Sequence, residues 1–546
     1  MVTSHSLLFN KTPPHPNPLP RRRRRGDKRK PLLLNPESST SLAQTDAVDH
    51  GCLPNWERAD LPEPLPFSFT NLFKTIGPGA ILLAAAIGGG EWIVGPVTAH
   101  NYGTGIMWIA TLAIVVQTIF NLEAARYTMY TGEPIITGFM RLRPGSRFWA
   151  WFYILIGLAQ LATPALAKGC ATVLFAAFVG RLSGKDDAAM VNAIGVGVIL
   201  LAVALLMSGK HIERVLEKLS WLMIAFIFSF LILVNVVFVP FGDWVQTARG
   251  FLVVQGLPDN VDLILLATFA ATAGSGGLGN LAISNWFRDK GFAMGSKVGA
   301  IGNALAGEHT GLKHVGVTFP ITDDNLRRWR VWWRYAVLDQ TALWGVGCFL
   351  GMYLNVNLAA SIIPPEAIID ERTAGAYQAE YMARLWQGFW LLTLINGFWI
   401  LFSTHLGNTD VLIRTVSDIC WSAFPGVRRR PIGVLYATLL GGLTVWAVFA
   451  VHLGSVLDLF KILGIVANPI MAIAAVQILR VNTRFLPKEV RPPLWRQAGL
   501  VLCALAYGGM TVALIWNMVN PKKPAPKPDS VTPAKTAQVV LERTHL

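Results

Sequence analysis

Residues 84–92 read AAAIGGGEW, and residues 271–280 read ATAGSGGLGN. Both stretches interrupt long apolar runs with glycines, each of which costs a helix about 1 kcal/mol relative to alanine. Lipid offers no hydrogen bonds, so unwound backbone at membrane depth is tolerated only inside protein or beside a polar cavity. Two such breaks at corresponding places in the two halves of a chain are typical of the substrate site of a secondary transporter.

The composition is typical of a membrane protein. Of the 546 residues, 53% are hydrophobic and only 14% are charged, and the mean hydropathy is +0.45. Soluble domains carry about 25% charged residues. The net charge of +15 arises mostly in short loops between apolar runs, where topology places Lys and Arg, so we expect no nucleic-acid partner. We expect an integral protein of an inner or plasma membrane.

The spacing of apolar runs predicts the fold. A helix of about 20 apolar residues crosses a bilayer, and this length predicts about eleven spans in the chain. Five spans precede Gly242, and five more lie between Val261 and Leu479. An odd number of spans per half gives the halves opposite orientations, which is the inverted-repeat plan. We therefore expect an all-α polytopic membrane protein with a 5+5 inverted repeat, in which helices 1 and 6 are discontinuous.

The domain organisation follows from these spans. Residues 1–66 are expected to form a disordered basic tail, because they are rich in Pro, Ser and Arg and lack apolar periodicity. A transmembrane domain is expected over residues 67–519, with repeat one at about 73–241, repeat two at about 261–479 and an extra helix at about 498–519. Residues 520–546 are expected to form a second disordered tail.

The charged loops predict the orientation. With the N-terminus in the cytoplasm, the inside loops carry most of the Lys and Arg, among them Arg428-Arg429-Arg430. The outside loop from Asn357 to Tyr381 is then acidic. An odd number of spans sends the C-terminus outside, but the Lys522-Lys523 pair argues against that side. The side of the C-terminus therefore stays open.

The first break exposes two kinds of backbone group. Carbonyls freed from Ala84 to Ile87 favour cations, whereas amides from Gly90 onward lie at the start of a half-helix and favour anions. Glu91 begins that half-helix, and an ionisable residue inside a span is a functional candidate by default. Glu91 is therefore either a ligand-binding carboxylate or a cap of the half-helix, and we favour the ligand.

The second break carries four glycines in six positions, with Ser275 among them. Close helix packing through small residues is the alternative explanation, but a packing motif needs fewer glycines. We expect the substrate to bind between the two breaks. The expected substrate-binding residues are Ala85, Gly88, Gly89, Gly90, Glu91, Ala271, Gly274, Ser275, Gly276 and Gly277.

Other polar residues lie within the expected spans. Glu123 and Arg126 have the spacing of an (i, i+3) ion pair. Lys168 is expected either to occupy a cation site with its ammonium group or to pair with a carboxylate. His405 and Asp410 either relay protons or belong to a structural hydrogen-bond network, which is slightly favoured. Lys168, His405 and Asp410 are the candidates for a proton or coupling pathway.

The remaining motifs are few. Asn468-Pro469 predicts a further break, in the tenth span. The sequence has no GxxxxGK[ST] loop, no HExxH and no Cys/His cluster at metal-ligand spacing. No nucleophile and base can be paired by motif spacing either. We therefore expect neither an enzyme nor a bound cofactor.

The chain resembles the Nramp (natural resistance-associated macrophage protein) family of proton-coupled divalent-metal transporters, which have the LeuT-type fold. The similarity covers roughly Phe73 to Leu479 and implies the same order of spans. The matching residues are Gly77-Pro78-Gly79, Trp92, Gln117, Ala125-Arg126 and Thr131-Gly132.

The chain departs from the family at the metal site. The family's first break reads Asp-Pro-Gly-Asn, and its Asp and Asn are replaced here by Gly88 and Glu91. The Met-Pro-His of the sixth span is replaced by Gly274-Ser275-Gly276, so the thioether that favours soft transition metals is missing. The acidic pair of the third span is replaced as well, near Lys168.

Hard oxygen donors remain. They favour a hard or hydrated divalent cation over soft transition metals. The resemblance implies that the metal-binding residues are Glu91, Ala85, Gly88, Ala271 and Gly274. The favoured function is a secondary active transporter that moves a metal cation by alternating access. Because the site has lost large side chains, a small organic solute is the alternative cargo, and a non-transporting sensor is the alternative role.

The expected partners follow from these alternatives. They are the lipid bilayer and either a metal cation or a small solute. Proton coupling, the direction of transport and the oligomeric state stay open.

Overall fold

The computed structural model describes residues 50–208, 212–259, 261–301, 311–370 and 372–520. Most of these residues are helical, because a chain in lipid must satisfy its backbone groups internally. Ten helices within the described residues are long and apolar enough to span a membrane. The pair α11 and α12, which is interrupted by the second break, supplies one further segment. The all-α polytopic fold is therefore confirmed.

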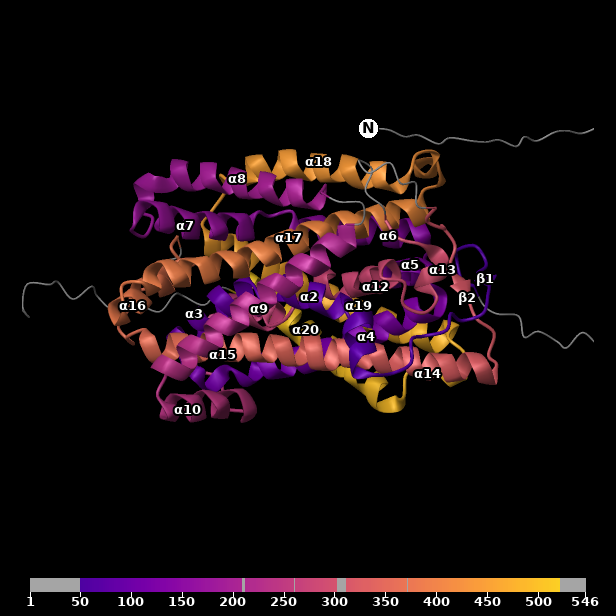
Figure 1. The fold of residues 1–546 in the computed structure, drawn as a ribbon, viewed down its shortest axis with the longest axis horizontal. Coiled ribbons are helices and arrows are strands. Elements are labelled where there is room, and N and C mark those ends of the chain that lie inside the picture. Colours follow the sequence, from indigo (N-terminus) through magenta and orange to yellow (C-terminus); the bar gives the residue numbers. More distant parts are fainter. Residues whose placement is uncertain (1–49, 209–211, 260, 302–310, 371, 521–546) are drawn as a thin grey trace, which may run out of the picture. The chain divides into compact units, whose positions relative to one another are not determined.

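Helices from the early and the late part of the chain are intermixed in one bundle (Figure 1). The elements of the first half are β1 (Glu57–Arg58), α1 (Phe69–Thr75), α2 (Pro78–Ala86), η1 (Gly90–Val94), α3 (Gly95–Tyr102), η2 (Thr104–Ile106), α4 (Trp108–Thr131), α5 (Ile135–Met140), α6 (Ser146–Leu161), α7 (Ala165–Val179), η3 (Lys185–Asp187), α8 (Ala188–Leu206), α9 (Ile212–Phe238) and α10 (Phe241–Leu252). Those that follow are α11 (Leu263–Thr272), α12 (Leu278–Asp289), α13 (Gly295–Val298), β2 (Val317–Thr318), α14 (Asp323–Leu338), η5 (Asp339–Gly345), α15 (Val346–Ile362), α16 (Tyr377–Leu385), α17 (Phe389–Ala423), η6 (Pro425–Arg429), α18 (Ile432–Ala450), α19 (Val456–Phe485), η7 (Lys488–Val490) and α20 (Leu494–Val519).

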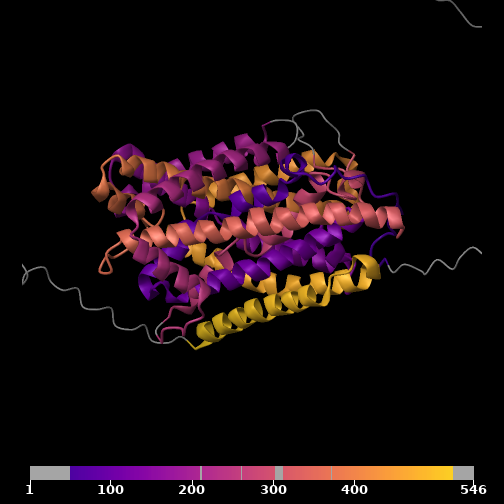
Figure 2. The same ribbon diagram turned by 60° about the horizontal axis from the view of Figure 1, so that its bottom comes forward.

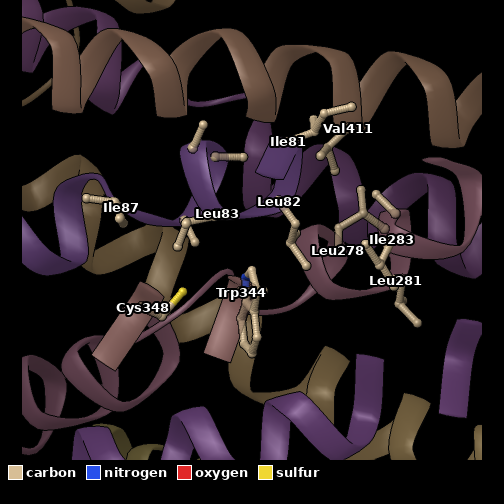
Figure 3. Packing of buried hydrophobic residues seen from close by; sticks show 14 of the residues in the cluster. Ile81, Leu82, Leu83, Ile87, Leu278, Leu281, Ile283, Trp344, Cys348 and Val411 are labelled. Atoms are coloured by element: carbon tan, nitrogen blue, oxygen red, sulfur yellow. The ribbon is translucent and has the colours of Figure 1, made fainter. Parts of the chain in front are cut away.

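The first broken helix lies at the centre of the bundle. Every residue of α2 is buried, as expected for a helix that is apolar on all sides. Glycines on α15 allow close approach, since Gly347 faces the Leu83 side chain and Gly351 faces Ile87. Figure 3 shows Leu83 beside Trp344 and Cys348. This packing fixes the start of the first break against its neighbours.

The start of α2 is held by a carboxylate from the second half. Asp339 accepts the backbone N–H of Gly77 at 3.0 Å and that of Gly79 at 2.7 Å. A Cβ atom on Gly79 would lie 2.4 Å from the Asp339 carbonyl oxygen, so the close approach requires glycine there. The Gly77-Pro78-Gly79 motif is therefore a docking point for the seventh span.

The helices share two ends. The basic end carries the described loops at residues 132–145, 290–301, 311–322 and 424–431, and the open end carries those at residues 180–187, 363–370, 372–376 and 451–455. Helix α20 packs on α19, α4 and α11. Figure 2 shows α20 in yellow at the bottom of the view, with neighbours on one side only. Its other face is left for lipid.

The ordered chain begins before residue 67, contrary to the expected tail of residues 1–66. Trp56 and Leu61 are buried, and β1 pairs in parallel with β2. Arg141 donates to the carbonyls of His50 and Pro54 at 2.7 and 3.0 Å and forms an ion pair with Glu133. These contacts explain the order. Residues 1–49 and 521–546, where the tails were predicted, lie outside the described residues.

The Glu133–Arg141 pair lies between two spans. Burial acts to raise the pKa of the Glu133 carboxyl, but the adjacent Arg141 guanidinium outweighs burial and holds that pKa below its ordinary value. The ion pair is therefore charged at neutral pH. It ties residues 50–54 to the loop before α5.

The predicted break at Asn468-Pro469 is wrong. Helix α19 runs without interruption from Val456 to Phe485 with Pro469 inside it. The Asn468 side-chain amide donates to the carbonyl of Gly464 at 2.7 Å and to that of Ala267 at 3.2 Å. These bonds supply donors near the position where proline removes one, and transmembrane helices tolerate proline on those terms.

The seventh span is a long helix. The elements α14, η5 and α15 form one continuous rod from Asp323 to Ile362. Its first turn is capped by Thr322, whose side chain accepts the N–H of Asn325. The arginines near its start pair with Glu63 and Asp324. The basic segment at residues 327–334 is therefore part of a helix.

Candidate functional site

The first break interrupts the helix, and neighbouring helices pack closely against its backbone. Helix α2 ends at Ala86, and Ile87, Gly88 and Gly89 precede η1. A Cβ atom on Gly88 would lie 2.1 Å from Thr404 Oγ1, and one on Gly89 would lie 2.0 Å from the Phe460 ring. The glycines are required because α17 and α19 approach the backbone at this point.

Thr404 lies beside the carbonyls that the first break frees. Its hydroxyl lies 3.1 Å from the Ile87 carbonyl oxygen and 3.4 Å from that of Ala84. The same hydroxyl lies 3.2 Å from the Ile400 carbonyl oxygen of its own helix, so its single proton can serve only one of these carbonyls at a time. The sequence reading did not identify this residue. Its signal was the polar run Ser403-Thr404-His405 inside an apolar span.

The second break uses left-handed backbone. Helix α11 ends at Thr272, and α12 begins at Leu278. Gly274, Gly276 and Gly277 have φ angles of +114°, +61° and +58°. This region of φ is open to glycine and costly for other residues, so the glycine run serves backbone conformation here.

Two glutamines satisfy the second break. Gln117 of α4 donates to the Ala273 carbonyl at 3.1 Å and accepts the Gly276 N–H at 3.3 Å. Gln160 of α6 donates to the Gly276 carbonyl at 3.2 Å and accepts the Leu278 N–H at 2.9 Å. An amide side chain carries both donor and acceptor, so each glutamine serves one freed carbonyl and one freed N–H.

The two breaks face each other across a small cavity, called here the central cavity. Its volume is about 20 Å³, which is room for about one water molecule. The residues that line it are Ala85, Ala86, Gly89, Gly90, Leu166, Thr272, Gly274, Ser275, Thr404, Asn408, Phe460 and Leu463. None of these described lining residues carries an ionisable side chain, and the Ser275 hydroxyl has no described hydrogen-bond partner.

The central cavity lies near the middle of the membrane. The helix pair from Pro78 to Tyr102 is 25 residues long, and Gly88 is its eleventh residue. At 1.5 Å per residue, the break lies about 15 Å from the start of the span. Fourteen residues follow Gly88 in the same span, so the break lies in the middle third of a segment long enough to cross a hydrocarbon core of about 30 Å.

Glu91 lies beside the break but does not line the central cavity. It is fully buried, and its Oε2 atom accepts the Gly88 N–H at 2.9 Å. This bond is the one expected of the alternative role, in which Glu91 caps the half-helix. Its Oε1 atom has no hydrogen-bond partner among the described residues. A carboxylate oxygen left unpaired away from water is unfavourable unless it binds a proton or a cation.

The structure brings half of the predicted binding residues to the cavity. Those that line it are Ala85, Gly89, Gly90, Gly274 and Ser275. The remaining predicted residues lie nearby but outside its lining. They are Gly88, Glu91, Ala271, Gly276 and Gly277.

Three residues had been assigned to a proton or coupling pathway. Lys168 lies near the open end, where its ammonium group donates to the carbonyls of Val451 and Gly454 at 3.0 and 2.8 Å. It has neither of the predicted partners among these contacts. His405 is buried, and its Nε2 atom has no described partner. Asp410 belongs to a charged network, so the structure gathers no continuous pathway from the three.

That network closes the basic end. Arg414 forms ion pairs with Asp289 and Asp410, and Arg288 forms ion pairs with Asp289 and Asp418. All five side chains are buried. Tyr436 and Trp286 add hydrogen bonds to Asp410 at 2.8 and 3.1 Å. The network joins α12 to α17 and α18.

The open end carries a large polar cavity, called here the open-end cavity. Its volume is about 760 Å³. The charged residues in its lining are Lys168, Lys185, Asp370, Arg372 and Asp458. Val456 lines the open-end cavity, and Phe460, one helical turn further along α19, lines the central cavity. About one turn of packed side chains therefore separates the two spaces.

Comparisons with known proteins agree with this architecture. No family model matches the chain. A protein of Pasteurella multocida that is described as uncharacterized is 29% identical over 149 residues, which are 27% of this chain. The match spans 32% of the length of that curated relative.

Solved structures match over most of the chain. A mutant of the manganese transporter of Eremococcus coleocola has a TM-score of 0.59 at 14% identity, covering 89% of this chain and 94% of its own. The same transporter in complex with an aromatic bis-isothiourea substituted compound has a TM-score of 0.58 at 14% identity, covering 90% and 95%. At this identity the likeness shows the fold, which is of the Nramp and LeuT type.

Proposed function

We propose that the protein is a secondary transporter that moves a cation by alternating access through the central cavity. The observation that carries the proposal is the pairing of two non-helical segments around a cavity at mid-membrane depth. Irregular backbone is costly at this depth and is retained where it forms a site. The fold shared with a manganese transporter supports the same function.

Glu91 is the proposed charged ligand. Its Oε1 atom is buried and unpaired, and a proton or a metal cation would compensate it. The carbonyls of Ala85 and Gly89, which line the central cavity, are the nearby backbone ligands we propose beside it. Carboxylate, carbonyl and the Ser275 hydroxyl are hard oxygen donors, which suit Mg²⁺, Ca²⁺ or Mn²⁺.

The central cavity must widen for transport. Its volume of about 20 Å³ accommodates about one water molecule and no hydrated divalent ion. The proposed motion therefore includes displacement of Phe460, which packs on Gly89. This displacement would join the central cavity to the open-end cavity.

Flux into proteoliposomes tests the cation proposal. Uptake of Mn²⁺, Mg²⁺, Ca²⁺ and Zn²⁺ is measured for the parent protein, for Glu91→Gln and for Glu380→Gln, an exposed carboxylate variant that serves as control. We expect uptake of a hard cation, and a loss of about a hundredfold in Glu91→Gln, equivalent to about 3 kcal/mol. Equal uptake by Glu91→Gln and Glu380→Gln would overturn the role of Glu91.

A small organic solute is the second candidate cargo. The central cavity has a neutral lining among its described residues, and the open-end cavity presents side chains of both charge signs. A zwitterionic solute would match that second surface. The same proteoliposomes, supplied with radiolabelled amino acids, distinguish the candidates. Amino-acid uptake without uptake of any metal would favour the solute and overturn the cation.

A further inference from the structure

A lateral groove runs along the lipid-facing side of the bundle between α6, α17 and α18. Its volume is about 770 Å³, within the range of small-molecule sites. Figure 1 shows α17 and α18 running beside each other. One stripe from each helix forms the walls, which include Trp151, Leu158, Val416, Phe424, Gly442 and Trp446.

Two polar side chains in the walls of the groove already use their hydrogen-bond donors within the protein. The Thr438 hydroxyl donates to the Val434 carbonyl of its own helix at 2.8 Å. The Trp446 indole N–H donates to the Ala162 carbonyl at 3.0 Å. The other walls are almost wholly apolar side chains, so the groove suits an apolar chain.

The length of the groove matches one leaflet. Along α17 it extends from Leu412 to Phe424, which is about 18 Å at 1.5 Å per residue. One leaflet contributes about 15 Å of hydrocarbon. The groove therefore reaches from the basic end to about the middle of the membrane, as a lipid acyl chain does.

The mouth of the groove is basic. Arg147 precedes Trp151 by four residues on α6, so both lie on the same face of that helix. Arg429 and Arg430 are exposed in the connection between α17 and α18. Residues 141–151 and 424–431 contain no Asp or Glu. The positive charge at the mouth is therefore not neutralised by either segment that forms it.

Aromatic residues mark the same level. The rings of Trp151 and Phe424 lie 5.9 Å apart at the mouth. Tryptophan is enriched where hydrocarbon meets headgroups. The arginines are thus at the depth of lipid phosphates, and the groove begins immediately below them.

We propose that the lateral groove binds an anionic phospholipid. One acyl chain occupies the groove, and Arg147, Arg429 and Arg430 hold the phosphate headgroup. Arginine suits this task because its planar guanidinium group binds phosphate oxygens in pairs. The site lies on the opposite side of α17 from Thr404 and is independent of the identity of any transported cargo.

Native mass spectrometry of the full chain tests the site. Delipidated protein in maltoside detergent is titrated with dipalmitoyl phosphatidylglycerol or dipalmitoyl phosphatidylcholine. The chain offers a matched pair of variants, because a Cβ atom on Gly441 or on Gly442 would meet nothing within 4 Å, and only Gly442 lines the groove. Gly442→Leu therefore fills the groove, and Gly441→Leu makes the same change beside it.

We expect one phosphatidylglycerol to bind the parent protein and Gly441→Leu, and Gly442→Leu to lose it. The double change Arg429→Gln and Arg430→Gln should weaken phosphatidylglycerol about thirtyfold, since each basic residue contributes about 1 kcal/mol near a lipid surface. Phosphatidylcholine should respond much less to the arginine changes.

Three outcomes would overturn the proposal. Equal phosphatidylglycerol binding by Gly442→Leu and Gly441→Leu would show that no chain enters the groove. If the arginine variant lost affinity equally for phosphatidylglycerol and phosphatidylcholine, the site would not select an anionic headgroup. A parent dimer that Gly442→Leu converts to a monomer would assign the groove to a second copy of the chain.

Discussion

The two ends of the helix bundle are closed in different ways. At the basic end, Arg288 and Arg414 form buried ion pairs with three aspartates and join α12 to α17. At the open end, a cavity of about 760 Å³ reaches to within about one helical turn of the central cavity. Leu166 and Phe460 are among the described side chains that line the central cavity on its side of this barrier.

The difference indicates which end opens more readily from this state. Separating α12 from α17 leaves charges unpaired in a buried region, which costs several kcal/mol. Displacing a phenylalanine into a neighbouring cavity breaks no ion pair. In the alternating-access cycle proposed above, the site would be exposed to one side at a time. The state described here is closed on both sides, with the thinner barrier toward the open end.

The largest predicted effect comes from breaking the basic-end network. Arg414→Gln removes the partner of Asp289 and Asp410 while keeping hydrogen-bonding capacity, so the free energy of unfolding should fall by about 3–5 kcal/mol. Denaturant titration in detergent micelles measures this fall. Arg330→Gln, an exposed change on α14, is the control and should stay within about 0.5 kcal/mol of the parent.

If Arg414→Gln lowered the free energy of unfolding by less than about 1 kcal/mol, the contrast between the two ends would be contradicted. The network would then contribute no more than a surface ion pair does. Closure of the basic end would have to be attributed to apolar packing around α12.

The second prediction concerns the second break, whose backbone is bonded by Gln160. Gln160→Leu leaves the Leu278 N–H and the Gly276 carbonyl without their partner, which should cost about 1–3 kcal/mol per buried group. The same denaturant titration measures it. Gln387→Leu, on an exposed loop, makes the same chemical change without unpairing a buried group. Equal stabilities of the two variants would mean that other donors, including water, satisfy the second break.

The sequence predicts the breaks, but it does not predict which side chains form hydrogen bonds with the backbone groups that the breaks leave unpaired. Runs of glycine are a local signal, because each weakens a helix wherever it occurs. Gln117, Gln160 and Thr404 meet the broken backbone across more than 100 residues of chain. Their pairing depends on how helices pack, which spacing along the chain does not record. The glutamines were visible as polar residues in spans, but their partners were not.

Pro469 and Asp410 show where local sequence rules hold and where tertiary structure decides. The local rule that proline ends a helix failed at Pro469, because α19 is held by tertiary packing and by the Asn468 side chain. Asp410 was expected to relay protons or to belong to a structural hydrogen-bond network, and it forms an ion pair with Arg414 on the same helix and joins Asp289 through tertiary structure. The (i, i+3) pair predicted for Glu123 and Arg126 is confirmed. Local chemistry was predictable where both partners share a helix.

The third prediction tests the thin barrier at the open end. Phe460→Ala should expose position 275 to the open-end cavity, so a Ser275→Cys thiol should react with a polar thiosulfonate about tenfold faster, equivalent to about 1.4 kcal/mol of easier opening. Peptide mass spectrometry measures the rate at that cysteine. Phe449→Ala, on the lipid-facing side of α18, should leave the rate unchanged. An unchanged rate in Phe460→Ala would place the barrier elsewhere.

The smallest predicted effect on the free energy of unfolding concerns a partly exposed ion pair at the basic end, which is compared with the buried network around Arg414. Lys290 pairs with Glu217 at 2.5 Å, but their side chains are 24% and 16% exposed. Lys290→Gln should therefore cost about 1 kcal/mol or less. At about 1 M salt the Debye length is near 3 Å, so this cost should fall toward zero, whereas the cost of Arg414→Gln should persist. Denaturant titrations at low and high salt compare the two. If salt erased both effects, the network around Arg414 would be reached by solvent, and the basic end would be no more firmly closed than the open end.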